Sequence, residues 1–444
     1  MISDRDLPEL ENYRRLEENL PIEAVPKFGP LVVSGENDNS PVHRWFKYKE
    51  AYSAGLLENI LSYAQMEPTK SGLVLLDPYC GVGTSLLSAQ VKSSSVSVAT
   101  GIERNPFVAF VARAKLGWPR INTRELERIG LEVLAGVNEM PHRLPELSSI
   151  RTGRCISRHI AQRLLSIRNA ILEFPECATR DALLVGLAAS IEPLSRVRKD
   201  GRALRLVDRS YQHVVPMLRQ KWIELQLDVT HMQALHKSLA RTKVCEGDGR
   251  SLRAVGIEPN STDIVLTSPP YPNNIDYSEV YKLELWLMGF VNSNAEFLGL
   301  RKSTLRSHPT SDLNTKPEGD FLTAIAKEPL VHFFEPLVQR TAAHEETWRN
   351  KLALGYFSDL WISLKEQYHC LRPGGRMFLV IGNSLHGTAG KAYLIPTDLL
   401  VGQLGKTLGF QLDRILIARN TRRRLSGNHF LRESIVALRK PKDV

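Results

Sequence analysis

A short apolar run that ends in two consecutive prolines is the feature that most constrains the fold of this chain. Residues 263–266 read Asp-Ile-Val-Leu, which is typical of a strand buried in a parallel sheet, and residues 267–271 follow as Thr-Ser-Pro-Pro-Tyr. Neither Pro269 nor Pro270 can donate a ladder hydrogen bond, so the chain must leave the sheet at Ser268. Ligands bind at the carboxyl ends of strands in open α/β sheets, so this stiff turn predicts a site for a flat ligand with an amino group at its edge. In the alternative interpretation, the prolines only stiffen the strand exit.

A second expected strand runs into a glycine-rich turn. Residues 73–76 (Leu-Val-Leu-Leu) form the strand, residues 77–84 read Asp-Pro-Tyr-Cys-Gly-Val-Gly-Thr, and a helix is expected over 85–91. A glycine turn between a strand and a helix lets a nucleotide-type ligand approach the backbone at the start of the helix. Leu86 stands where the dinucleotide fingerprint has its third glycine, so the glycine pair is weak evidence when taken alone.

Two further expected strands end in acidic residues. Residues 98–103 end in Glu103, about 20 residues after the glycine turn, where a carboxylate can accept hydrogen bonds from both hydroxyls of a ribose. Residues 242–246 lead to Asp248, whose carboxylate would meet an adenine amino group. Each acid alone is typical of a surface position at a strand end. Their order along the chain, followed by the proline turn, predicts one nucleotide-type cofactor site.

With these motifs together, the chain resembles the S-adenosylmethionine-dependent amino-methyltransferases that act on DNA bases. Residues 77–84 resemble the cofactor loop of that family, and residues 102–106 (Ile-Glu-Arg-Asn-Pro) resemble its ribose-binding strand end. Residues 267–271 resemble its catalytic motif in the form typical of cytosine-N4 enzymes, whereas adenine-N6 enzymes more often carry aspartate or asparagine in place of Ser268. Residues 48–53 (Tyr-Lys-Glu-Ala-Tyr-Ser) are similar to its N-terminal cofactor motif.

The resemblance implies a class I, Rossmann-like α/β methyltransferase fold, with helices on both faces of the sheet and a large helical insertion. The sheet of this fold often ends in an antiparallel pair of strands, which we expect here over 412–418 and 434–438. The implied cofactor is S-adenosyl-L-methionine, and the residues implied to bind it are Tyr52, Ser53, Asp77, Tyr79, Gly81, Gly83, Thr84, Glu103, Arg104, Asp248 and Ser268. The implied catalytic residues are Ser268, Pro269, Pro270 and Tyr271, and no metal is expected.

The expected chemistry starts from a weak nucleophile, because the lone pair of an exocyclic base amine is delocalised into the ring. The Oγ atom of Ser268 and the carbonyl oxygen of Pro269 would accept the amino hydrogens while the nitrogen attacks the methyl group. Preorganised dipoles of this kind contribute a few kcal/mol to lowering a barrier. Tyr271 would stack on the base, which is worth ~1–3 kcal/mol, and the base would have to flip out of the duplex to reach the turn.

Length and composition bound the domain organisation. A chain of 444 residues with 43% hydrophobic residues is long enough for two domains, or for one domain with a large insertion. We expect residues 1–40 to form an N-terminal lead-in, and residues 41–120 and 241–444 to form the catalytic domain. Residues 121–240 show helical periodicity without convincing strands, and they are expected to be a helical insertion that recognises the target or binds DNA.

The basic balance of the chain favours a polyanionic partner. The formal net charge is +10, and residues 151–210 hold 12 Lys or Arg against 6 acidic residues. Such density is typical of phosphate contacts, although a solvated helix face that pairs with acids elsewhere is the alternative. The candidate DNA-binding residues are Arg196, Arg198, Lys199, Arg202, Arg205, Arg422, Arg423 and Arg424. A third basic cluster, which competes with these, comprises Arg301, Lys302, Arg306 and His308.

Cysteine usage and hydropathy point to the interior of a cell. The five cysteines are scattered without a Cys-x-x-Cys pair, which argues against a structural zinc site or a disulfide framework. The N-terminus lacks the apolar segment of a signal peptide, and the longest apolar run, residues 182–191, is too short to span a bilayer. We therefore expect a soluble cytoplasmic protein that works on double-stranded DNA. Any restriction endonuclease partnered with it would be a separate protein.

The sequence thus predicts a site-specific DNA methyltransferase that modifies the N4 amine of cytosine in a flipped-out base. The alternatives are an adenine-N6 enzyme, an RNA base methyltransferase and an enzyme that methylates protein glutamine amides. The basic charge and the long insertion oppose the protein substrate. A non-enzymatic alternative is a DNA-binding regulatory subunit on an inactive scaffold, which the presence of Asp77, Glu103, Ser268 and Tyr271 opposes.

Overall fold

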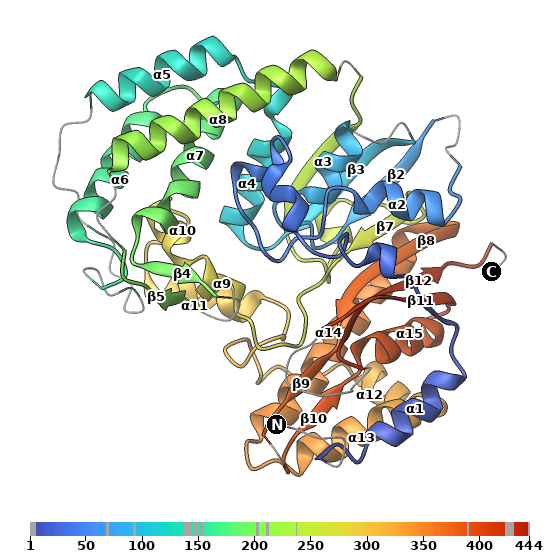
Figure 1. Ribbon diagram of the computed structural model, residues 1–444. Helices are drawn as coiled ribbons and strands as arrows, with labels where there is room; N and C mark the ends of the chain where they lie inside the picture. Colours follow the sequence, from blue (N-terminus) through green and yellow to red (C-terminus); the bar gives the residue numbers. More distant parts are fainter. Residues whose placement is uncertain are drawn as a thin grey trace.

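A single eight-stranded sheet crosses the computed structural model (Figure 1). The structure describes residues 6–67, 71–91, 95–136, 144, 150, 154–200, 204–209, 213–236, 238–388, 390–421 and 430–442. The strands, in spatial order, are β1 (Ile22–Ala24), β11 (Gln411–Asn420), β12 (Arg432–Arg439), β8 (Leu371–Gly382), β7 (Thr262–Thr267), β2 (Leu73–Asp77), β3 (Val96–Glu103) and β6 (Arg241–Glu246). Within this sheet, β12 pairs antiparallel with both of its neighbours, and the other neighbouring pairs are parallel. The expected antiparallel pair near the C-terminus is therefore confirmed.

Consecutive side chains of the central strands face opposite sides of the sheet and enter two separate hydrophobic cores. Leu75 and Ile264 belong to one core, whereas Leu76 and Val265 belong to the other. The first core includes residues of α2 (Leu56–Tyr63), α3 (Thr84–Val91) and α4 (Pro106–Leu116). The second includes residues of α1 (Leu10–Glu18), α12 (Gly319–Ile325), α13 (Leu330–Ala342), α14 (Trp348–Cys370) and α15 (Thr397–Thr407). The predicted Rossmann-like α/β sheet with helices on both faces is confirmed.

Four helices of the predicted insertion pack against one another at one end of the molecule (Figure 1). They are α5 (Thr123–Gly136), α6 (Arg158–Leu172), α7 (Ala178–Leu194) and α8 (Val214–Leu235). The indole of Trp222 is buried between them and donates a hydrogen bond to the carbonyl oxygen of Leu183 at 3.0 Å. A side chain at Gly186 would place its Cβ 2.6 Å from that indole, so the glycine is what allows α7 and α8 to approach.

The expectation that residues 121–240 contain no strands was wrong. β4 (Val197–Lys199) and β5 (Leu204–Leu206) form a small antiparallel pair after α7. Each strand has three residues, which is too short to give a recognisable alternation of apolar and polar side chains. Some of the basic residues that suggested phosphate contacts therefore lie on this short pair of strands.

The helical insertion shares a continuous core with one face of the sheet. The carboxylate of Asp228 on α8, 2% exposed, ties it to the segment that precedes the cofactor motif. Asp228 accepts hydrogen bonds from the backbone amide of Val42 at 3.0 Å and from the indole of Trp45 at 3.1 Å, and it forms an ion pair with Arg44. The insertion is thus anchored by buried polar contacts as well as by apolar packing.

The described part of the expected lead-in, residues 6–40, is folded into the molecule. Leu10 and Tyr13 of α1 are buried in the core that also contains α13, and β1 adds a parallel strand beside β11. These apolar residues recur at helical spacing, but they are few among polar neighbours, which is why composition suggested a lead-in. Among the described helices, none is both long and apolar enough to cross a membrane.

Candidate functional site

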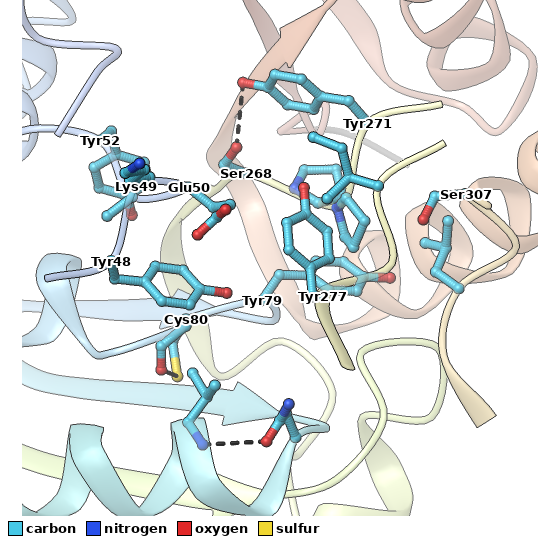
Figure 2. Close-up of a pocket in the computed structure, with 18 of the residues that line it drawn as sticks. Tyr48, Lys49, Glu50, Tyr52, Tyr79, Cys80, Ser268, Tyr271, Tyr277 and Ser307 are labelled. Carbon is cyan, nitrogen blue, oxygen red and sulfur yellow. Dashed lines mark hydrogen bonds between the residues drawn. The ribbon is translucent and has the colours of Figure 1, made fainter. Parts of the chain in front are cut away.

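A cavity of about 710 Å³ opens where β2, β3 and β7 end (Figure 2). It brings together most of the residues that the sequence singled out. The predicted residues that line it are Tyr52, Tyr79, Gly81, Thr84, Glu103, Arg104, Asp248, Ser268, Pro269, Pro270 and Tyr271. Three other predicted residues, Ser53, Asp77 and Gly83, do not line it. The first group gathers because the carboxyl ends of parallel strands meet at the same edge of a sheet.

Asp77, which was predicted to bind the cofactor, lies beneath the cavity and does not line it. Its side chain is 1% exposed. The carboxylate accepts hydrogen bonds from the hydroxyls of Thr267 at 2.7 Å, Tyr52 at 3.0 Å and Ser85. Burial raises the pKa of Asp77, while these hydrogen bonds oppose that rise. Asp77 therefore fixes the ends of β2 and β7 relative to the start of α3.

Ser53 and Gly83 also lie outside the lining of the cavity. Ser53 is 1% exposed, donates a hydrogen bond to the carboxylate of Glu36 and accepts one from the backbone amide of Gly55. Gly83 has a φ of +80°, and a Cβ there would lie 3.3 Å from the Cβ of Ala112 on α4. This glycine allows the positive φ of the turn and its close contact with α4.

The glycine turn and Glu103 form one wall of the cavity. The two carboxylate oxygens of Glu103 accept hydrogen bonds from the backbone amides of Gly81 at 3.1 Å and Asn105 at 2.7 Å. Burial raises the pKa of Glu103 to about 7, although these amides lower it. Each oxygen of a carboxylate has a second lone pair, so Glu103 can still accept hydroxyl groups of a ligand.

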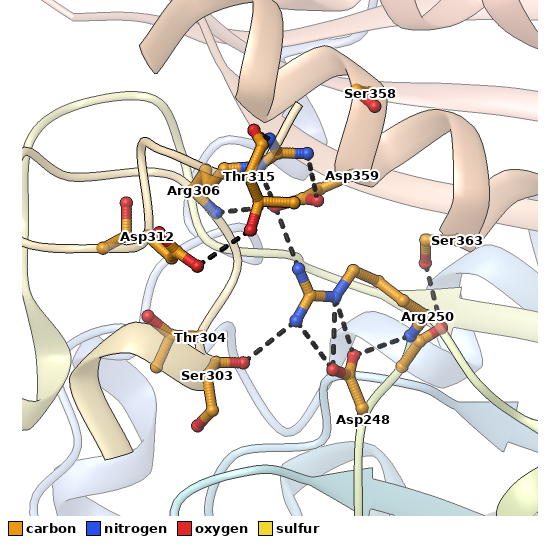
Figure 3. Close-up of polar contacts among 12 residues, drawn as sticks. Asp248, Arg250, Ser303, Thr304, Arg306, Asp312, Thr315, Ser358, Asp359 and Ser363 are labelled. Atoms are coloured by element: carbon orange, nitrogen blue, oxygen red, sulfur yellow. Dashed lines mark hydrogen bonds and ion pairs between the residues drawn. The ribbon is translucent and has the colours of Figure 1, made fainter. Parts of the chain in front are cut away.

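Asp248 faces the same cavity, but Arg250 holds its carboxylate (Figure 3). The guanidinium of Arg250 donates from Nη2 to Oδ2 of Asp248 at 2.7 Å and from Nε to Oδ1 at 3.0 Å. Burial would raise the pKa of Asp248, but the hydrogen bonds and charge of Arg250 outweigh it and hold that pKa below its usual range. Arg250 also pairs with Asp359 on α14 at 3.0 Å, and Asp359 pairs with Arg306 at 2.8 Å. This buried network was not anticipated from the sequence.

The proline turn is fixed at both ends. At its start, Thr267 is hydrogen-bonded to Asp77, as described above. At its end, the carbonyl oxygen of Pro272 accepts a hydrogen bond from Ser384 of β9 (Ser384–His386) at 3.0 Å. The ring of Tyr271 lies against Gly382, where a Cβ would come within 2.9 Å of it, and its hydroxyl accepts a hydrogen bond from Ser268 at 3.4 Å. The turn thus holds a hydroxyl and an aromatic ring in fixed positions at the cavity.

Three residues that sequence reasoning did not select complete the cavity beside the proline turn. Tyr48, Glu50 and Tyr277 of α9 (Tyr277–Val280) line it together with Ser268 (Figure 2). Glu50 accepts a hydrogen bond from the hydroxyl of Tyr281 at 2.7 Å, and the Tyr281 ring stacks on Tyr48 with a centroid separation of 5.2 Å. Tyr48 and Glu50 belong to the N-terminal motif, but nothing in their spacing distinguished them from Tyr52.

Lys199 was predicted to bind DNA, and the structure contradicts this. Its side chain is 7% exposed and forms an ion pair with Glu284 of α10 (Lys282–Leu287), whose side chain is 2% exposed. The Lys199 ammonium also lies 4.3 Å from the ring centroid of Tyr281. Glu284 is therefore the buried partner of Lys199.

The remaining predicted DNA-binding residues divide by exposure. Arg196, Arg198 and Arg205 are exposed, and Arg205 pairs with Asp200 at 3.6 Å. Arg202, Arg422, Arg423 and Arg424 lie outside the described residues. In the competing cluster, Arg306 is buried and Arg301 pairs with Asp276 at 2.6 Å. Among the described residues, no group of three or more His, Cys, Asp or Glu side chains is placed to hold a metal ion.

Comparison with known proteins relates nearly the whole chain to two curated enzymes. The chain is 24% identical to the Type II methyltransferase M.BsoBI of Geobacillus stearothermophilus, covering 95% of this chain and 90% of that protein. It is also 24% identical to the Type II methyltransferase M.AvaI of a Nostoc species, covering 93% of this chain and 89% of that protein. The chain is similar to Type II methyltransferases. No protein-family model matches it.

Solved structures give weaker likenesses. The rRNA methyltransferase aviRa from Streptomyces viridochromogenes is 12% identical, with a TM-score of 0.28 and coverage of 93% of this chain and 90% of that one. An arsenic(III) S-adenosylmethionine methyltransferase from Chlamydomonas reinhardtii is 11% identical, with a TM-score of 0.27 and coverage of 87% and 72%. These TM-scores are too low to establish a common fold.

Proposed function

We propose that this chain is a DNA methyltransferase that transfers a methyl group from S-adenosyl-L-methionine to the exocyclic N4 amine of cytosine. One observation carries the proposal. Ser268 and Tyr271, at the end of β7, line the same cavity as the glycine turn and Glu103. A rigid amine-binding turn thus shares a space with a carboxylate suited to a ribose. The similarity to Type II methyltransferases supports an enzyme that methylates DNA.

The residues of the cavity fit a nucleoside-type cofactor. Glu103 would accept hydrogen bonds from ribose hydroxyls, and Asp248 would accept one from an adenine amine. Gly81 has a φ of +54°, and a Cβ there would lie 3.2 Å from the ring of Tyr48, so a larger residue would narrow the cavity. When bound, S-adenosyl-L-methionine supplies an electrophilic methyl group. These residues would bind and orient it.

The proline turn would position the amine and accept its hydrogens. Ser268 and Pro269 both line the cavity, and the Oγ atom of the first and the carbonyl oxygen of the second would be two acceptors on adjacent residues. Hydrogen bonds to acceptors with fixed positions favour the geometry in which the nitrogen lone pair is directed at the methyl group. The Tyr271 ring, held against Gly382, offers a surface on which a flipped base can stack.

For DNA contact, we propose the helical insertion over 121–240, with residues 41–120 and 241–444 forming the catalytic domain. Arg198 on β4 is exposed, unlike its neighbour Lys199, so it can reach a phosphate. The formal net charge of +10 favours such a polyanionic partner. Phosphate contacts of this kind position the protein on DNA but do not read the sequence.

Mass spectrometry of nucleosides tests the function directly. The purified protein is incubated with DNA and methyl-labelled S-adenosyl-L-methionine, and the DNA is then digested to nucleosides. We expect labelled N4-methylcytosine. Labelled N6-methyladenine would overturn the choice of base while keeping the mechanism. No label in DNA, from protein that binds the cofactor, would overturn the proposed function and direct the assay to RNA.

Substitution of Ser268 tests the role of the turn. We expect Ser268→Ala to keep the cofactor dissociation constant and to lower the rate of methyl transfer about 10²–10³-fold, as removal of one preorganised hydrogen-bonding group does. Ser307→Ala is the matched control, because Ser307 also lines the cavity but belongs to another segment. Near wild-type turnover by Ser268→Ala would refute the catalytic assignment.

A further inference from the structure

We propose that Glu50 is the base that removes the proton from the amine during methyl transfer. This role rests on the function proposed above and extends it. Glu50 lines the cavity together with Ser268 and Tyr277, and in Figure 2 its carboxylate points into the cavity between Tyr48, Tyr277 and Ser268. The carboxylate thus faces the space in which the amine would lie.

Atom and charge balance require an acceptor for one proton. The amine nitrogen forms a bond to the methyl carbon, the carbon–sulfur bond breaks, and its electron pair goes to the sulfur. The nitrogen is then left with one proton more than the neutral product. A serine hydroxyl and a backbone carbonyl, the acceptors of the proline turn, can orient this proton but cannot retain it at neutral pH. A carboxylate accepts it and later releases it to solvent.

The other three carboxylates that line the cavity already have strong partners within the described residues. Glu103 accepts two backbone amides, Asp248 is held by Arg250, and Glu433 forms an ion pair with Arg419 at 2.5 Å. The side-chain contact of Glu50 is different in kind, because the neutral hydroxyl of Tyr281 donates a hydrogen bond to its carboxylate at 2.7 Å. A neutral donor orients the carboxylate without holding its charge as firmly as a guanidinium does.

The surroundings of Glu50 favour proton uptake. Burial raises the pKa of Glu50, and the Tyr281 hydrogen bond opposes that rise, as do the charges of Lys199 and Lys49. The other titratable groups that face it are Tyr48 and Tyr277, whose own pKa values are raised by burial and by the charge of Glu50. Lys199 is itself paired with Glu284, which limits its attraction for Glu50.

The experiment measures, for four proteins, the single-turnover rate of methyl transfer to DNA against pH, with the cofactor saturating at every pH so that titration of Glu103 does not enter the rate. In the wild type we expect the rate to rise with pH through a midpoint above the ordinary glutamate pKa. Glu50→Gln keeps the size and can still accept the Tyr281 hydrogen bond. We expect this variant to be about 10²–10⁴-fold slower at pH 8, with its cofactor dissociation constant unchanged. We also expect it to lose the acidic limb of the profile, that is, the fall in rate toward low pH.

Tyr281→Phe and Glu433→Gln complete the set. Tyr281→Phe removes a hydrogen bond that lowers the pKa of Glu50, so we expect the acidic limb to move to higher pH. A merely structural role of Glu50 would not move that midpoint. Glu433→Gln changes another carboxylate of the same cavity, and we expect it to keep the acidic limb where the wild type has it.

The outcomes separate this inference from the proposed function. A wild-type protein that methylates no DNA would overturn the proposed function and the role of Glu50 with it. A wild type that methylates DNA, together with Glu50→Gln that keeps the rate within threefold and retains the acidic limb, would overturn the role of Glu50 alone. Loss of both rate and limb in Glu50→Gln, with a shifted limb in Tyr281→Phe, would establish it.

Discussion

Replacing Lys199 with methionine should destabilise the protein without weakening its contacts to DNA phosphates. Methionine preserves most of the apolar stem but leaves Glu284 as a buried carboxylate without its cation. Oε2 of Glu284 already has no hydrogen-bond partner within the described residues, so no second group compensates. Breaking one partner of a buried pair typically costs about 3–5 kcal/mol, and we expect a loss of this size in the free energy of unfolding at pH 8.

The sign of the pH dependence follows from Glu284. Burial raises the pKa of this carboxyl, and loss of Lys199 would raise it further. In the folded variant, the Glu284 carboxyl therefore keeps its proton at pH values at which the same carboxyl in the unfolded chain has already lost it. The deficit relative to the wild type should therefore be largest at pH 8 and shrink as the pH falls toward the unfolded glutamate pKa of about 4.3.

Urea denaturation followed by tryptophan fluorescence measures the deficit, and the double variant Lys199→Met/Glu284→Gln should recover most of it. The matched control is Arg198→Met, one residue earlier and exposed. We expect this control to change the free energy of unfolding by less than about 0.5 kcal/mol. It should also reduce the slope of the logarithm of the DNA-binding constant against the logarithm of salt concentration by about one, as the loss of one phosphate contact does. A Lys199→Met protein that keeps wild-type stability at pH 8, yet shows the reduced salt dependence, would refute this reasoning.

Three further predictions concern the cavity. Cofactor affinity, measured by calorimetry, should fall up to about tenfold per pH unit below pH 7. Burial raises the pKa of Glu103 to about 7, and protonation removes an acceptor for the ribose hydroxyls. An affinity that is constant between pH 6 and 8 would contradict this. Gly382→Val should displace the Tyr271 ring, because ring atoms would lie 2.9 Å from the new Cβ. We expect this variant to slow methyl transfer more than it weakens cofactor binding. Equal losses in transfer rate and in cofactor affinity would argue against a stacking role of Tyr271. Asp77→Ala should lower the free energy of unfolding by about 2–4 kcal/mol, because it removes the acceptor of three buried hydroxyls. A denaturation curve like that of the wild type would exclude this stabilising role of Asp77.

The central part of the fold was predictable because two local signals coincided there. The central strands β2 and β7 are short apolar runs, and each is followed by residues that interrupt a strand, as at Gly81 and Pro269. Strand-end residues converge in any open parallel sheet, so sequence order alone placed most of them in one cavity. The same logic could not separate Asp77, which lies below the cavity, from Tyr79, which lines it.

What the sequence did not reveal depends on contacts between distant segments. Lys199 looks like its basic neighbours, and its burial follows from Glu284, 85 residues later. The pairing of Asp248 with Arg250 and of Arg250 with Asp359 likewise joins three elements that no periodicity connects. Glu50 was visible within its motif, but its place beside the proline turn depends on Tyr281, which lies between α9 and α10. Charged residues alone do not disclose whether their partner is water, protein or a ligand.

The pairing of β1 with β11 also has a consequence for how the chain is made. Ile22 aligns with Ile415, and Glu17 forms an ion pair with Arg432, a separation of 415 residues. A nascent chain emerges N-terminus first, so α1 and β1 leave the ribosome long before their partners exist. These two elements are thus made well before they can reach their final places, and until then the outer edge of β11 has no strand beside it.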